Sequence, residues 1–347
     1  TPSTQQPNGA TSTWKHLAKV CAQWPQARQE MQSRLKKWEK AGFSFRLEWL
    51  LRCVNAAANG EALFDVLVDT TTEKFQADLK RTEQLVDSLL NLIAARLGLD
   101  HDLVLRSPFS LPLMARYLWQ RGGHLPSQKE RDKLLYWYVH TFLWGRYAGS
   151  TESTLNQDLR LISQPDGGLD RLIEELRLFR GDLRLQASDF RDWSVGARFY
   201  PLLYMLTRVY HAKDWDSGVE LTNHLLGHLS RLELHHIFPK ARLYKHGYSR
   251  PEVNAIANFT FLTQQTNLSI ADSDPAEYLD RFDQCQPGAI ASHWIPMDRD
   301  LWKIQNYREF LTARRGLLAK AANDFLDSLL LGTVPSIPAG PSILERE

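Results

Sequence analysis

Two adjacent histidines at the end of a short alternating segment are the residues of this chain best suited to chemistry. The segment reads Leu-Glu-Leu-His-His-Ile-Phe over 232–238 and is closed by Pro239. Alternation of apolar and polar residues that ends at a proline predicts a short strand, because proline cannot donate to a sheet ladder. Since neighbouring strand residues point to opposite faces, His235 and His236 are predicted to take different roles.

A second apolar run lies downstream and predicts the strand that pairs with the first. It reads Phe-Thr-Phe-Leu-Thr over 259–263, and a polar segment that carries Asn267 follows it. The predicted order is therefore strand, long loop, strand and helix. This order places Asn258 at the start of the second strand and Asn267 near the start of the helix.

These residue types suit metal-assisted hydrolysis of a phosphodiester. One imidazole can hold a divalent cation, while the other takes a proton from water near neutral pH. Asn267 offers a neutral carbonyl oxygen to a hard cation such as Mg²⁺. Asn258 is predicted to tie the long loop to the hairpin through its amide. Taken singly, the histidines are equally well explained as structural residues at a strand edge, and the asparagines as turn or cap residues.

Four short motifs in this region resemble a known nuclease family. They read His-His-Ile-Phe-Pro, Asn-Phe-Thr-Phe-Leu-Thr, Thr-Asn-Leu-Ser-Ile and Pro-Ala-Glu-Tyr-Leu, and they begin at residues 235, 258, 266 and 275. Together they resemble the HNH nuclease domain at the C-terminus of GmrSD-type modification-dependent restriction enzymes, including SspE-like phage-defence relatives. The resemblance continues through His-Trp-Ile-Pro at 293–296 and covers roughly residues 216–330.

The resemblance implies a role for each site residue. His235 matches the family's first metal ligand, His236 its general base, Asn258 the asparagine that pins the loop, and Asn267 the second metal ligand. The implied cofactor is Mg²⁺ or Mn²⁺. The implied function is cleavage of DNA during bacterial restriction of phage or modified DNA, in the cytoplasm.

The same family places a helical segment between the nuclease and an upstream nucleotide-hydrolysing domain. That upstream domain carries an Asp-Gly-Gln-Gln-Arg string, which this sequence lacks, and there is no GxxxxGK[ST] loop. We therefore expect this chain to be the C-terminal part of a larger NTP-dependent protein, or a reduced relative of one. The upstream domain would then be a partner that lies outside these residues.

Basic residues in the predicted loop are candidates for contacts with nucleic-acid phosphates. They are Lys240, Arg242, Lys245 and Arg250. Phosphate contacts need local cations and do not need a high net charge, which suits a chain whose formal charge is only +2. Arg314 and Arg315 on the last predicted helix are further candidates. A solvated loop or an exposed helix face explains each of these cations about as well.

The rest of the chain predicts a mainly α fold. Nothing before Ser217 alternates convincingly at period two. We expect a flexible linker at 1–13, a helical domain at 14–215, an HNH (ββα-metal) nuclease domain with C-terminal helices at 216–332, and a flexible tail at 333–347. Helices are predicted at 14–41 (split at Pro25), 45–58, 73–97, 109–121, 127–147, 151–162, 169–180, 197–212 and 307–330.

Composition limits the other possibilities. The three cysteines are far apart and form no CxxC pair, which disfavours a paired-cysteine zinc site and a disulfide framework. No apolar run is long enough to span a membrane, and the polar start lacks a signal-peptide pattern. Three alternatives stay open: a non-catalytic DNA-binding or assembly module, an RNase or toxin nuclease with the same motif, and a purely helical scaffold. Homo-oligomerisation also stays open.

Overall fold

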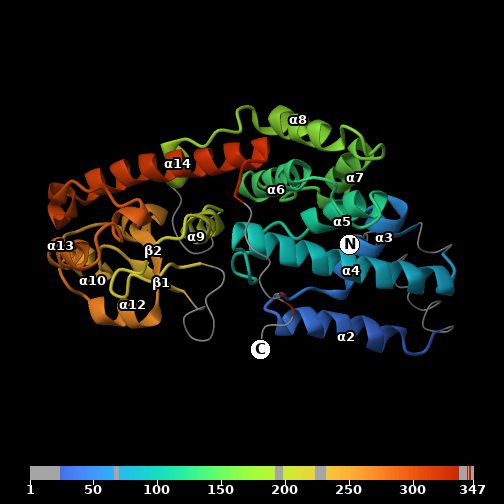
Figure 1. Cartoon of the computed structure of the whole chain (residues 1–347), viewed down its shortest axis with the longest axis horizontal. Helices are drawn as coiled ribbons and strands as arrows, with labels where there is room; N and C mark the ends of the chain where they lie inside the picture. The colour runs from blue at the N-terminus through green and yellow to red at the C-terminus, as the bar shows by residue number, and fades with distance from the viewer. Residues whose placement is uncertain are drawn as a thin grey trace, which may run out of the picture.

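The computed structural model describes residues 24–65, 70–191, 198–222 and 232–335, together with Ser342 and Leu344. The predicted linker at 1–13, the start of the helix predicted at 14–41 and most of the predicted tail lie outside the described residues. The described chain is mostly helical and holds a small two-stranded sheet (Figure 1), so the mainly α class is confirmed. No helix of these ranges combines the length and apolar character that crossing a membrane requires.

The N-terminal part consists of helices that follow the predicted ranges closely. They are α2 (Ala27–Lys40), α3 (Leu47–Asn59), α4 (Thr72–Leu97), α5 (Ser110–Gln120), α6 (Gln128–Leu143), α7 (Thr151–Leu161), α8 (Gly168–Arg180), the 3-10 turn η2 (Ala187–Arg191) and α9 (Tyr200–Val209). Helix α3 ends at Gly60, which has a left-handed backbone with φ of 75° and donates to the oxygen of Ala56. Glycine adopts this conformation without steric cost, which is why Asn-Gly stops the helix.

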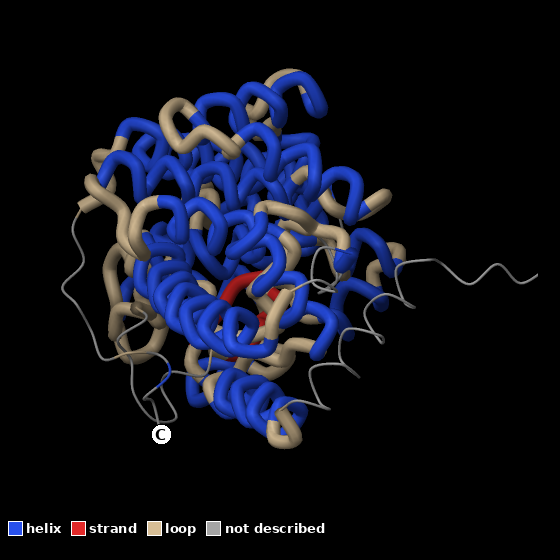
Figure 2. Tube along the Cα trace, turned by 90° about the vertical axis from the view of Figure 1, so that its right-hand side faces the viewer, coloured by secondary structure: helices blue, strands red, loops and turns tan. Residues whose placement is uncertain are grey.

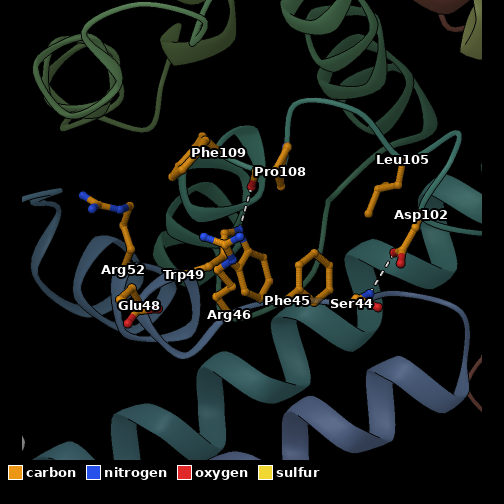
Figure 3. A pocket seen from close by; sticks show the side chains of 10 residues that line it. All are labelled: Ser44, Phe45, Arg46, Glu48, Trp49, Arg52, Asp102, Leu105, Pro108 and Phe109. Carbon is orange, nitrogen blue, oxygen red and sulfur yellow. Dashed lines mark hydrogen bonds between the residues drawn. The ribbon is translucent and has the colours of Figure 1, made fainter. Parts of the chain in front are cut away.

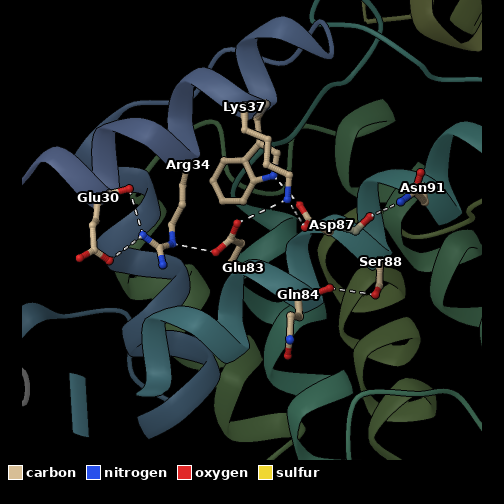
Figure 4. Close-up of polar contacts among 9 residues, drawn as sticks. Glu30, Arg34, Lys37, Glu83, Gln84, Asp87, Ser88 and Asn91 are labelled. Atoms are coloured by element: carbon tan, nitrogen blue, oxygen red, sulfur yellow. Dashed lines mark hydrogen bonds and ion pairs between the residues drawn. The ribbon is translucent and has the colours of Figure 1, made fainter. Parts of the chain in front are cut away.

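Polar contacts attach α2 to the long helix α4 (Figure 4). The Trp38 side chain is fully buried, and its indole N–H donates to the Asp87 carboxylate at 2.7 Å. Lys37 pairs with the same carboxylate at 2.6 Å, and Arg34 pairs with Glu83 at 2.7 Å. Exposed ion pairs of the Lys37 type contribute at most about 1 kcal/mol. The buried indole therefore contributes most of the stability of the contact between α2 and α4, and the ion pairs add little.

The C-terminal part holds the sheet. Strands β1 (Glu233–His236) and β2 (Phe259–Leu262) pair antiparallel, with His235 opposite Thr260 and His236 opposite Phe259. Figure 2 shows the two strands lying among helices. The loop between them contains α10 (Lys240–Lys245), α11 (Arg250–Val253) and the 3-10 turn η4 (Ile256–Asn258). The elements after β2 are α12 (Gln264–Ile270), α13 (Pro275–Cys285), the 3-10 turns η5 (Ala291–His293), η6 (Arg299–Trp302) and η7 (Ile304–Asn306), and α14 (Tyr307–Leu331).

Helix α14 belongs to two hydrophobic cores. Its start, including Tyr307 and Phe310, packs in a cluster formed by the C-terminal elements. Its second half, including Leu318 and Phe325, packs in the cluster of the N-terminal helices. Figure 1 shows α14 running from above the sheet towards α6. The predicted domain division at 215/216 assigns α14 to one side, whereas its side chains contribute to both cores.

Arg314 of α14 lies at the junction of these cores and is fully buried. Its Nη1 donates to the oxygens of Ala257 and Phe259 at 2.7 and 2.6 Å, and its Nη2 donates to the oxygen of His293 at 3.1 Å. The expectation that Arg314 lies on an exposed face and can reach phosphate is therefore wrong, because backbone carbonyl groups occupy its donors. Arg315 is partly buried and donates to the oxygen of Phe190 at 3.3 Å.

Buried histidines should make the fold sensitive to acid. His140 of α6 is 1% exposed, and burial lowers its pKa to about 3. An unfolded imidazole titrates near pH 6.5, so below that pH the unfolded chain binds a proton that the folded chain does not. The stability is therefore complete above pH 6.5 and is lost as the pH falls. We expect His140 to lower the free energy of unfolding by about 3 kcal/mol between pH 7 and pH 4.

Urea unfolding at each pH measures this effect. His140→Phe should make the dependence less steep, and His246→Gln, at an exposed position, is the control substitution. Equal slopes in all three proteins would contradict the assignment to His140.

Candidate metal and hydrolysis site

His235 faces the interior from β1 and is 4% exposed. The Trp215 ring meets it edge to face, with ring centroids 5.5 Å apart. Its Nδ1–H donates to Oδ1 of Asn267 at 2.8 Å, because an amide oxygen only accepts. Burial lowers the His235 pKa to about 4, with the contact to Asn267 acting in the opposite direction. The imidazole is therefore neutral at pH 7, as a metal ligand must be.

Asn267 reaches His235 from the first turn of α12. That helix begins at the N-cap Thr263, whose side chain accepts from the N–H of Thr266. The backbone N–H of Asn267 donates to the oxygen of Thr263 at 3.0 Å. The helix thus fixes the backbone of Asn267 and directs its side-chain amide oxygen towards His235 on β1. The two residues that sequence analysis selected as metal ligands are brought together.

His235 and Asn267 offer a divalent cation a small set of protein ligands. Among the described residues, no three His, Cys, Asp or Glu side chains gather into a metal-binding group. A cation at the pair would therefore have two protein ligands, Nδ1 of His235 and Oδ1 of Asn267. Such a cation would replace the hydrogen bond between these two atoms. The other ring nitrogen of His235, Nε2, is buried and has no hydrogen-bond partner within the described part of the chain, so it can carry the imidazole proton when Nδ1 binds a cation. Mg²⁺ commonly keeps several waters and accepts few protein ligands, and the pair fits such an ion.

His236 points to the opposite side of β1, as alternation predicts, and is partly exposed. Its Nε2 lies 3.4 Å from Oδ1 of Asn254, whose own Nδ2 donates to the oxygen of Arg250 at 2.9 Å. Because Nδ2 is used in this way, Oδ1 must accept from His236, and the His236 proton resides on Nε2. Its Nδ1 then keeps a lone pair that can accept a proton.

The electrostatic surroundings keep His236 neutral. Burial lowers its pKa to about 4, and the nearby Lys240 ammonium contributes in the same direction. The Phe259 ring meets the imidazole edge to face at 4.6 Å. At neutral pH the ring is therefore unprotonated, which is the state that a general base requires.

Asn258 ties the loop to the hairpin, as predicted. Its side chain is fully buried, and its Oδ1 accepts from the N–H of Phe238 at 2.8 Å. Its Nδ2 donates to the oxygens of Phe238 and Val253 at 3.1 and 3.0 Å. These bonds join the end of β1 to the end of α11. The residue positions the loop and is closed off from any substrate.

The four predicted cations of the loop differ in their surroundings. Lys240 and Lys245 of α10 and Arg250 of α11 are exposed. Arg242 is half-buried; it donates to the oxygen of Asp272 at 2.5 Å and pairs with the Asp274 carboxylate at 3.1 Å. Arg242 therefore connects α10 to the start of α13, and Lys240 is the cation whose charge acts on His236.

Sequence analysis missed two residues of the site. Asn254 follows α11 as its C-cap, and asparagine is common there, so no sequence signal linked it to His236. Asp214 lies next to the predicted domain division at 215/216, and its buried carboxylate accepts hydrogen bonds at the start of α12. A buried carboxylate can only be recognised once the folded chain brings its donors together.

A pocket of about 630 Å³ lies beside α3 (Figure 3). This helix lies far from the sheet (Figure 1). Phe45 and Trp49 stack in its wall with ring centroids 3.8 Å apart. The Trp49 indole N–H donates to the oxygen of Pro108, and the Ser44 N–H donates to Asp102. These polar groups are engaged within the protein, so the pocket volume does not by itself indicate chemistry.

Comparison with known proteins gives one distant relative. No family model matches the chain. The chain is 26% identical over 151 residues to an uncharacterized protein of Methanocaldococcus jannaschii. The match covers 43% of this chain and 25% of the length of that relative. The relative's description names no activity, so the chemistry must be argued from the site.

Proposed function

We propose that this chain is a divalent-metal-dependent endonuclease of the HNH (ββα-metal) type that hydrolyses phosphodiester bonds of DNA. One observation carries the proposal: Nδ1 of His235 and Oδ1 of Asn267 converge to 2.8 Å on one side of β1, while the neutral His236 occupies the other side. Metal-assisted hydrolysis needs a ligand pair and a general base that act on one phosphate, and the adjacent positions of His235 and His236 on β1 keep the two imidazoles within range of each other's charge.

Each residue has a defined part in the proposed reaction. His236 takes a proton from water at Nδ1, and the resulting hydroxide attacks phosphorus as the bond to the 3′-oxygen breaks. The 3′-oxygen leaves with the electron pair of that bond and takes a proton from solvent. Asn254 holds the His236 Nε2–H, and Asn258 holds the loop end against which the imidazole rests. His235 and Asn267 would hold Mg²⁺ or Mn²⁺, and the bound ion would stabilise negative charge on the leaving oxygen.

The biological setting is proposed from the resemblance of the motifs. GmrSD-type enzymes restrict phage or modified DNA in bacteria, and we propose the same role in the cytoplasm for this chain. We further propose that it is the nuclease part of a larger NTP-dependent protein. The phosphate-binding cations and the site itself grip the nucleic-acid backbone, so the choice of DNA over RNA rests on the family resemblance.

Cleavage assays on both polymers test this function. Supercoiled plasmid and single-stranded RNA should be incubated with the chain and Mg²⁺ or Mn²⁺, with EDTA as the control. We expect relaxed or linear plasmid in the presence of metal and none with EDTA. Cleavage of RNA alone would support the RNase alternative. DNA binding without cleavage of either polymer would support the non-catalytic module.

The exposed cation beside the base should contribute to DNA binding. Lys240→Ala should weaken binding and reduce the slope of log affinity against log salt concentration by about 1, because one phosphate contact is lost. Arg242→Ala is a matched control from the same helix, and it should instead lower the free energy of unfolding by about 1 kcal/mol. Fluorescence anisotropy of labelled duplex across salt concentrations measures the slopes. An unchanged slope for Lys240→Ala would contradict the predicted contact.

A further inference from the structure

Asp214 is a fully buried carboxylate at the entrance to the C-terminal part of the chain. Its Oδ1 accepts from the backbone N–H and the hydroxyl of Thr263, both at 2.9 Å. Its Oδ2 accepts from the hydroxyl of Thr266 at 2.5 Å, and from the N–H and hydroxyl of Ser217 at 3.1 and 2.9 Å. Burial alone would raise its pKa, but these bonds lower it, so the group is a carboxylate.

These bonds fix the beginning of α12. Thr263 is the N-cap of that helix and Thr266 lies in its first turn. The helix has only seven residues, and a helix so short is not stable by itself in water. Asp214 therefore supplies negative charge and acceptors at the N-terminus, where a helix is stabilised by both. Asn267 is the next residue after this anchored turn.

The neighbouring residue supports the other proposed ligand. Trp215 is fully buried, and its ring contacts the imidazole of His235 with centroids 5.5 Å apart. Trp215 also packs against His293, with ring centroids 5.6 Å apart. The Nε2–H of His293 donates to the oxygen of Lys213 at 2.9 Å, and its Nδ1 accepts from the hydroxyl of Thr260 at 2.6 Å. Two adjacent residues therefore act on the two proposed ligands: Asp214 anchors the helix that carries Asn267, and Trp215 packs on His235.

We infer that Asp214 is a positioning residue, which sets the relative placement of Asn267 and His235 and thereby the affinity of the site for a divalent cation. This inference rests on the proposed function, since it assumes that the pair holds a metal. Asp214 does not contact the cation or the substrate. It acts through Thr263 and Thr266 on α12, and through the attached Trp215 on the imidazole. Supports of this kind typically change metal affinity by about 10–100-fold when they are removed.

Calorimetric titration with Mn²⁺ tests the inference on the whole chain. Asp214→Asn should weaken Mn²⁺ binding at least about tenfold. Asp274→Asn is the matched control, because Asp274 is the N-cap of the neighbouring helix α13 and accepts from the N–H of Ala276 at 3.0 Å, but it supports neither proposed ligand. Thr266→Val removes a single donor to Asp214, and it decides the question if Asp214→Asn fails to fold. It should also weaken Mn²⁺ binding, while Asp274→Asn should bind Mn²⁺ as the parent does.

Two results would overturn the inference. The first is parental Mn²⁺ affinity in folded Thr266→Val and, where it folds, in Asp214→Asn. The second is an equal loss of affinity in Asp274→Asn, because the effect would then be general destabilisation of the domain. A parent chain that binds no Mn²⁺ would contradict the proposed function itself. If the parent binds Mn²⁺ and the variants at Asp214 and Thr266 bind it equally well, only the role of Asp214 is contradicted.

Discussion

His236→Ala should reduce metal-dependent plasmid cleavage by about 10²–10⁴-fold, the usual contribution of a positioned general base. Its imidazole is neutral at pH 7, its Nε2–H is directed to Asn254, and its Nδ1 retains the lone pair that accepts the proton. Alanine removes that acceptor without touching the pair on the other face of β1. Mn²⁺ affinity should therefore stay at the parental value, which separates loss of the base from loss of the metal.

Two further variants define the specificity of this effect. His246→Ala changes an exposed histidine of the same loop, and it should cleave plasmid as the parent does. Asn254→Ala should have an intermediate rate, because the imidazole remains but its orientation is less fixed. Equal cleavage by His236→Ala and the parent would show that another residue, or a contaminant, activates the water.

Arg314→Met should lower the free energy of unfolding by about 3 kcal/mol. Three carbonyl groups lose charged donors, and hydrogen bonds to charged groups contribute about 1.5–3 kcal/mol each. Part of this loss is offset, because burial of the guanidinium is itself costly and lowers its pKa to about 9. Two of the carbonyls, those of Ala257 and Phe259, flank Asn258. The variant should therefore also disturb the loop that supports His236.

Urea unfolding gives the comparison, with Arg315→Met as the matched control on the same helix. Arg315 is only partly buried, and its hydrogen bond to the oxygen of Phe190 is 3.3 Å long. We expect its replacement to cost about 1 kcal/mol or less. Equal losses for the two variants would mean that the buried bonds of Arg314 do not stabilise the junction.

Helices with regular apolar spacing and clear end signals could be predicted well from the sequence. The range predicted at 73–97 is observed as Thr72–Leu97, and the range at 307–330 as Tyr307–Leu331. Both end at a glycine with a left-handed backbone, Gly98 and Gly332. The strands were also predictable, because proline and the alternating pattern limit where β1 can lie. The helix predicted at 127–147 was too long, since a turn at Gly145, with φ of 65°, follows its observed end at Leu143.

Features that depend on contacts between distant segments could not be predicted. An arginine in an amphipathic helix is normally exposed, so nothing in the sequence indicated that Arg314 is buried against the carbonyl groups of Ala257, Phe259 and His293. The predicted long loop contains the short helices α10 and α11, and Ser249 and Glu252 form a capping box at the start of α11. The pairing of His235 with Asn267 was expected from the motif, whereas the support from Asp214 follows only from the folded chain.

The most direct measurement is electron paramagnetic resonance of Mn²⁺ bound to the chain, with histidine labelled by ¹⁵N. We expect one bound ion per chain, with hyperfine coupling to a single histidine nitrogen. That coupling should disappear in His235→Ala, and the ion should be lost in a chain that also carries Asn267→Ala. No bound Mn²⁺, or a coupling that persists unchanged in His235→Ala, would show that this pair is not a metal site and would contradict the proposed nuclease.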